Sequence, residues 1–227
     1  MAHIQEIGPE LWTVKHPFSM AGLRLGTTTT VVRHEEELMV ISPGPFKETQ
    51  WKEVEALGRV SLLVAPNKMH HLFLSDAQDR YPEARTLVAP GLLEKRPDLK
   101  GAVELPQSLI EWGLQQRLLG GLPDLKETVF WHSPSRTLIC TDLVFNFSSH
   151  PHFATRCFLC LNGANGSFGP TRVLKHLFLK DRELLAADLE EIVKWPIENI
   201  VLGHGDNVIG DGRAKMESAF GWLTRAR

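Results

Sequence analysis

The sequence predicts an α/β protein in which two mixed β-sheets lie between layers of helices. Near the start of the chain, two strand-like segments joined by a tight charged turn indicate an antiparallel hairpin. In both halves, short apolar runs alternate with segments of helical period, which implies a parallel component in the sheets. A length of 227 residues suits one large domain or two small ones. Because no low-complexity linker interrupts it, we expect a single domain over residues 1–227.

In the first half, strands come first and then alternate with helices. A helix is expected over residues 47–57, where Trp51, Val54 and Leu57 fall at helical spacing. A second helix is expected over residues 71–80. The strands expected in this half, of which the second is rich in β-branched residues, are residues 11–14, 27–32, 37–41, 60–65 and 86–89.

The second half repeats this order more loosely. A Ser-Pro turn separates two strands expected over residues 128–132 and 137–143. Residues 150–170 have no clear period, and we interpret them as a long loop or a local insertion. The other elements expected here are a helix over residues 181–194, a buried strand over 199–202 and a closing helix over 213–223.

The composition argues against several classes of protein. The formal net charge is −2 without a basic stripe, so electrostatic binding of nucleic acid is not expected. No apolar run reaches the roughly 18 residues of a transmembrane helix, and the first residues lack the order of a signal peptide. Three cysteines, an odd number, argue against a disulfide framework. We therefore expect a cytoplasmic protein that does not associate with membranes.

Three segments carry metal-competent side chains just after predicted strands, where layered α/β folds build their sites. His70 and His71 follow the first such strand, although one could instead pack while the other caps or meets solvent. Asp142 follows an apolar run, and a buried carboxylate needs a donor, a cation or a metal. It could equally accept backbone N–H groups as a structural residue. His204 stands between two glycines that free its backbone to turn.

A fourth segment contains His150, His152, Cys157 and Cys160, all of them residue types that can ligate zinc. Two bulky apolar residues separate the cysteines, and nothing nearby completes a convincing set of four ligands. We expect core thiols rather than a second zinc site, and the sequence leaves the roles of these four residues open.

The order of the first three segments resembles the metallo-β-lactamase superfamily. Its signature is a strand ending in Thr-His-x-His-x-Asp-His, later a strand ending in Gly-Asp, and finally one ending in Gly-His. This chain has Ala-Pro-Asn-Lys-Met-His-His over residues 65–71, Thr141-Asp142 and Gly203-His204. The resemblance covers nearly the whole chain and implies a four-layer αββα sandwich. The chain is most similar to a divergent branch known mainly as a domain of unknown function; further matching segments are residues 30–33, 41–43 and 135–138.

The departures from the signature indicate a reduced metal site. Pro66 and Lys68 stand where the superfamily has its first two histidines, so the first metal site is expected to be lost. For the second site, the resemblance implies that four residues hold one divalent metal ion, with zinc expected first and iron or manganese as alternatives. The implied ligands are His70, His71, Asp142 and His204.

Two functions remain open on this basis. The first is a mononuclear metal-dependent hydrolase that activates a water against a small-molecule substrate. Lys68 and Asp142 are its candidate catalytic residues, since Lys68 could replace the charge of the missing metal toward an anionic substrate, or else be a solvated surface lysine. Asp206 could orient His204. The second is a catalytically inactive binding or scaffold protein that keeps the fold.

Overall fold

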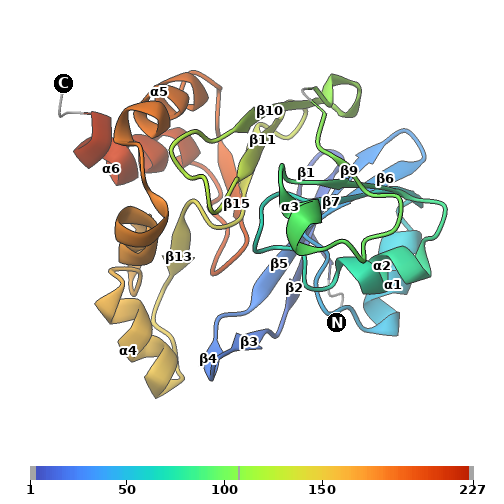
Figure 1. Cartoon of the computed structure of the whole chain (residues 1–227), viewed down its shortest axis with the longest axis horizontal. Helices are drawn as coiled ribbons and strands as arrows, with labels where there is room; N and C mark the ends of the chain where they lie inside the picture. Colours follow the sequence, from blue (N-terminus) through green and yellow to red (C-terminus); the bar gives the residue numbers. More distant parts are fainter. Residues whose placement is uncertain (1–3, 107, 225–227) are drawn as a thin grey trace.

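Two β-sheets pack face to face between two layers of helices in the computed structural model, which describes residues 4–106 and 108–224 (Figure 1). The first sheet is antiparallel from β1 to β6 and parallel from β6 to β9, so the predicted hairpin and the predicted parallel component are both present. Across this seven-stranded sheet the order is β1 (Ile4–Gly8), β2 (Leu11–His16), β5 (Thr27–His34), β6 (Glu37–Ile41), β7 (Arg59–Ala65), β8 (Arg85–Val88) and β9 (Val103–Glu104).

The second sheet is mixed and has four strands. Its antiparallel strands β10, β11 and β12 are followed by β15, which pairs in parallel with β12. Their bounds are β10 (Leu114–Leu118), β11 (Thr128–His132), β12 (Thr137–Cys140) and β15 (Asn199–Leu202). Two short antiparallel pairs stand apart from the main sheets: β3 (Ser19–Met20) with β4 (Leu23–Arg24), and β13 (Phe145–Phe147) with β14 (Ser167–Gly169).

Helices cover the outer face of each sheet, which confirms the predicted αββα arrangement (Figure 1). The first sheet is covered by α1 (Glu48–Glu55), α2 (Leu74–Arg80) and α3 (Leu92–Lys95), and the second by α5 (Arg182–Ile192) and α6 (Gly212–Thr224). The remaining helical segments are η1 (Ile110–Trp112), α4 (Phe153–Leu161) and the π-helix η2 (Leu174–Phe178). Within the described residues, no helix has the length and apolar character to span a bilayer.

The strands sort their side chains alternately into separate cores, as their twofold side-chain period requires. On β7, Leu63 faces the helices, whereas Leu62 and Val64 face the second sheet. On β11, Phe130 enters the core between the sheets, and its neighbours Val129 and Trp131 face α5 and α6. Each of these buried strands therefore contributes side chains to two cores, one between the sheets and one under the helices. This shared packing fixes the sheets against each other, with the ends of both at one edge of the sandwich.

Two predicted elements near the candidate site differ from the observed ones by three residues at one end. The second helix begins at Leu74 rather than at residue 71, because the Oδ1 atom of Asn67 accepts hydrogen bonds from the backbone N–H groups of Met69 and His70 and holds a turn there. The strand expected over residues 137–143 ends at Cys140. Consequently both the histidines and Asp142 lie in loops beyond the strand ends.

Residues 150–170, interpreted as a long loop or a local insertion, are not a long loop. This segment contains α4 and β14. Helix α4 buries only Thr155 and Leu159, one turn apart, so its apolar face is too narrow to produce a recognisable period in the sequence.

Candidate metal centre

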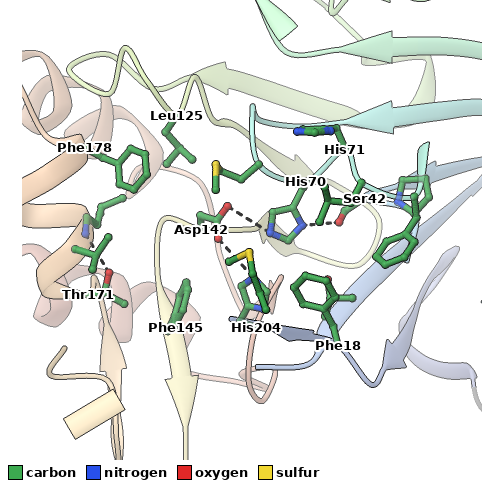
Figure 2. A pocket seen from close by; sticks show the side chains of 18 of the residues that line it. Phe18, Ser42, His70, His71, Leu125, Asp142, Phe145, Thr171, Phe178 and His204 are labelled. Carbon is green, nitrogen blue, oxygen red and sulfur yellow. Dashed lines mark hydrogen bonds and ion pairs between the residues drawn. The ribbon is translucent and has the colours of Figure 1, made fainter. Parts of the chain in front are cut away.

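Three loops at the carboxyl ends of parallel strands bring His70, Asp142 and His204 together (Figure 2). His70 follows β7 of the first sheet, whereas Asp142 and His204 follow β12 and β15 of the second. Their ligand-competent atoms all lie within 4.8 Å of one another. The site therefore lies between the two sheets, at the edge where both end.

The spacing of these atoms suits a tetrahedral metal ion. The Nε2 atom of His70 is 3.3 Å from Oδ2 of Asp142, and Nε2 of His204 is 3.6 Å from Oδ1. Two ligand atoms bound to zinc at about 2.05 Å, with a tetrahedral angle between them, are about 3.3 Å apart. Two imidazoles and one carboxylate also form a common zinc donor set that leaves a fourth position open. The residues present thus fit a divalent ion.

Hydrogen bonds on the far side of the rings fix which nitrogen faces the centre. The Nδ1 atom of His204 lies 2.6 Å from the carbonyl oxygen of Gly26, which can only accept, so Nδ1 carries the proton. In the neutral ring, Nε2 then has its lone pair free to ligate. The Nδ1 atom of His70 lies 2.6 Å from Oγ of Ser42, which leaves Nε2 of His70 directed at Asp142.

Asn67 connects the two loops that carry the ligands. Its Nδ2 atom donates to Oδ2 of Asp142 at 2.7 Å and to Oγ1 of Thr141 at 2.9 Å. Its Oδ1 atom accepts from the backbone N–H groups of Met69 at 2.8 Å and His70 at 2.7 Å. This fully buried amide therefore orients the carboxylate and holds the His70 loop with the same side chain.

Glu127 is a second buried residue behind the site that the sequence did not single out. Its carboxylate accepts hydrogen bonds from the backbone N–H groups of Thr141 and Asp142 and from the Thr141 hydroxyl. Burial, and next the charge of Asp142, raise the pKa of Glu127 to about 7. It stabilises the Asp142 loop, and nothing in its local sequence distinguishes it from a surface glutamate.

The electrostatics favour the metal-binding ionisation states of Asp142 and His204, but not that of His70. Burial alone would raise the pKa of Asp142, but the nearby imidazole of His70, followed by that of His204 and the Asn67 amide, lowers it well below its usual range. Burial, and then the neighbouring His70, lower the pKa of His204 to about 4 despite the opposing charge of Asp142. At neutral pH Asp142 is therefore ionised and His204 is neutral. For His70, burial lowers the pKa, but the carboxylates of Asp142 and Glu127 outweigh it and the net shift is upward.

Comparison with known proteins supports the fold directly. No family model matches the sequence, and no curated protein matches it. Among solved structures, the DIM-1 metallo-β-lactamase exposed to ceftazidime matches with a TM-score of 0.66 and 12% identity, covering 99% of this chain and 97% of its own. The metallo-β-lactamase from Pontibacter korlensis matches with a TM-score of 0.66 and 13% identity, covering 99% of both chains. TMB-1 matches with a TM-score of 0.65 and 15% identity, covering 97% of both chains.

This chain has the metallo-β-lactamase fold. The agreement of the backbones, with TM-scores of 0.65 to 0.66, establishes the fold, and sequence identities of 12% to 15% leave the reaction open. The resemblance in the loop motifs and the agreement of the whole backbone thus point to the same architecture.

Within this metallo-β-lactamase fold, His71 lies outside the ligand group, contrary to the predicted set of four. Its Nδ1 atom accepts a hydrogen bond from Nη1 of Arg96 at 2.9 Å. A guanidinium can only donate, so the neutral ring carries its proton on Nε2, and neither nitrogen offers a free lone pair. Burial, and then the charges of Lys95 and Arg96, lower the pKa of His71 to about 4. We therefore correct the candidate ligand set to three residues.

Lys68 lies away from the cavity, which agrees with the alternative of a lysine outside the site and not with the candidate catalytic role. Its Nζ atom lies beside Gly91, 3.7 Å from where a β-carbon on that residue would stand, and Lys68 is not among the residues that line the cavity at the centre. Lys95 lines that cavity instead, with its Nζ donating to the Lys68 carbonyl oxygen at 3.1 Å. Among the described residues, the lysine that lines the cavity is thus one that the motif does not contain.

Asp206 does not orient His204, contrary to the prediction. Its carboxylate is exposed and forms an ion pair with Lys15 at 2.8 Å. The Gly26 carbonyl orients the His204 ring instead, by accepting the hydrogen bond from its Nδ1. The glycine turn after β15 directs the ring toward Gly26, in the loop before β5.

The fourth segment forms the start and body of α4. His152 precedes the helix, and its Nδ1 lies 2.9 Å from Oγ1 of Thr155, while His150 accepts from the backbone N–H of His152. Cys157 is half-buried and Cys160 is exposed, so the expectation of core thiols is wrong for Cys160.

Proposed function

We propose that this protein is a metal-dependent hydrolase that holds a single divalent metal ion between His70, Asp142 and His204. The observation that supports it is the spacing of 3.3 Å and 3.6 Å between the two imidazole Nε2 atoms and the carboxylate oxygens, close to the edges of a zinc tetrahedron. Zinc suits the set best, and iron or manganese are compatible with it. The three ligands leave room for water and substrate.

Each residue around the centre has a defined part in this proposal. A bound divalent ion supplies Lewis acidity and makes a water acidic enough to yield a nucleophile near neutral pH. Asn67 holds the carboxylate of Asp142 in place, and the Gly26 carbonyl keeps the proton of His204 on Nδ1. The cavity of about 360 Å³ that opens at these side chains would hold the substrate beside them (Figure 2).

Metal titration tests the ligand set. Protein stripped with a chelator should bind one equivalent of Zn²⁺ or Co²⁺. His204→Ala should weaken binding by at least about 100-fold, more than the loss typical of a residue that only supports a ligand. His71→Ala is the matched control and should retain the wild-type stoichiometry, because Arg96 occupies its Nδ1. Equal loss in both variants, or no bound equivalent in the wild type, would refute the proposed centre.

Hydrolysis is tested on the same preparations. Activity against carboxylic or phosphoric esters should disappear with the metal, return when one equivalent is restored, and be absent in His204→Ala. A protein that binds one equivalent and hydrolyses neither class would instead be the inactive binding or scaffold relative.

A further inference from the structure

The wall of the cavity beyond the metal ligands is mostly apolar, with hydroxyl groups from Thr27, Ser42 and Thr171 among the lining residues. Its inner part is formed by side chains from five separate segments. Figure 2 labels four of these side chains around Asp142, those of Phe18, Leu125, Phe145 and Phe178. Phe18 and Phe73 meet edge to face, with ring centroids 6.0 Å apart, and so join the hairpin of β3 and β4 to the loop before α2. The inner wall consists of Phe18, Phe73, Leu125, Phe145, Leu174 and Phe178.

The rim of the same cavity is apolar too, although it faces solvent. Met20, Met69, Leu72 and Val173 line the cavity and are 47%, 40%, 52% and 37% exposed. Large apolar side chains gathered at one exposed mouth are typical of a binding site, whereas apolar residues scattered singly over a surface need no explanation. The apolar surface therefore continues from the inner wall to the opening.

Charges in the cavity are few outside the centre. The other titratable groups among the described lining residues are His71, which is paired with Arg96, and Lys95, which donates to a backbone carbonyl. A phosphoryl group carries full negative charges, and apart from the metal ion at the centre this cavity offers a single lysine to compensate their lost hydration. An uncharged carboxylic ester does not incur that loss.

We infer that the substrate class is an amphiphilic carboxylic ester, with its carbonyl at the His70, Asp142 and His204 centre and a medium-length alkyl chain along the apolar wall. The reaction rests on the proposed function, whereas the binding of the chain rests on the cavity alone. Water adds its oxygen to the acyl carbon, the acyl C–O bond breaks, and the leaving alkoxide takes up a proton. The products are an alcohol and a carboxylate, with one proton released.

Hydrolysis of p-nitrophenyl esters measures the chain preference. With the zinc-loaded protein, kcat/KM should rise from acetate through butyrate and hexanoate to octanoate. Each buried methylene contributes about 0.8 kcal/mol, or about fourfold, so each step of two carbons should bring about 15-fold. Bis(p-nitrophenyl) phosphate should be a poorer substrate than the octanoate ester. A flat or falling series, or preference for the phosphodiester, would overturn the inference.

Binding to the metal-free protein separates the cavity from the chemistry. Calorimetric titration with alkanoates from hexanoate to dodecanoate should give a Kd that falls about fourfold per methylene until the cavity is filled. Loss of that dependence would overturn the inference. If the dependence is present but the zinc-loaded protein hydrolyses no ester, the proposed function fails while the alkyl-chain site stands.

A pair of surface variants provides the matched control. Leu72→Gln with Val173→Asn makes the rim polar and should weaken dodecanoate binding about tenfold, since two apolar contacts are lost. Ile110→Gln with Ile209→Gln changes two residues that are each 63% exposed and do not line the cavity, and should leave Kd unchanged. Equal effects of the two pairs would show that the chain does not bind at this rim.

Discussion

Asn67→Ala should lower the free energy of unfolding far more than the small change in side-chain volume suggests. The reason is that this one side chain forms hydrogen bonds to both loops that carry the metal ligands. The substitution removes hydrogen bonds to Thr141 and Asp142 and leaves the backbone N–H groups of Met69 and His70 without their acceptor. The amide is fully buried, so water cannot readily replace it.

The magnitude follows from these contacts. A neutral hydrogen bond contributes about 1 kcal/mol, and one to a carboxylate contributes about 1.5–3 kcal/mol. Three neutral bonds and the bond to Asp142 give a loss of about 5 kcal/mol in the free energy of unfolding. The variant should also bind Co²⁺ about 10- to 100-fold more weakly, because Asp142 loses the group that orients it.

Urea unfolding followed by tryptophan fluorescence measures the loss. Asn162→Ala is the control, since Asn162 is also nearly buried, but its side chain donates one hydrogen bond, to the Phe158 carbonyl. That variant should cost about 1 kcal/mol. If Asn67→Ala costs no more than Asn162→Ala, the reasoning that the amide links the two loops is wrong.

Three further outcomes follow from the structure. Burial lowers the pKa of His132 to about 4, so between pH 6.5 and 4 the unfolded chain binds a proton that the native chain does not. The free energy of unfolding should therefore fall by up to about 3 kcal/mol as pH drops through this window, and urea titrations of His132→Asn should lack that part of the slope. Phe130→Ala, in the core between the sheets, should cost about 3–5 kcal/mol, whereas Phe153→Ala, at 69% exposure, should cost less than about 1 kcal/mol; equal costs would contradict the assigned core. Lys68→Ala should leave metal content unchanged in a zinc assay, because the ammonium stands beside Gly91 rather than in the cavity, and metal loss as large as in His204→Ala would contradict that placement.

The sequence by itself determined the layered class and most strands of the two sheets, whereas β1, β9 and β10 had no predicted counterpart. Residues 37–41, 128–132 and 199–202 were predicted with the bounds that the structure shows for β6, β11 and β15. Their short, continuously apolar runs could be recognised because burial on both faces of a strand is a local property of the chain. Helix α4 was missed because only two of its side chains are buried.

The loop motifs placed His70, Asp142 and His204 in one site, but only the tertiary structure decided which neighbours join them. His71 follows His70 directly, yet Arg96, 25 positions further along the chain, occupies its Nδ1. Glu127 has no local feature that marks it as buried behind Asp142.

The apolar cavity was likewise beyond the reach of the sequence. Its walls come from the β3–β4 hairpin, the loop after β7, the turn before β11, strand β13 and the η2 segment. Each contributes one to three apolar residues of ordinary local pattern, such as Phe145 or Leu174. The hydrophobic periodicity and composition of a segment indicate which of its faces is buried. The lining of a cavity depends instead on which segments, far apart in the sequence, lie next to one another in the fold. Packing of the two sheets brings these segments to one edge, and that packing alone creates the site.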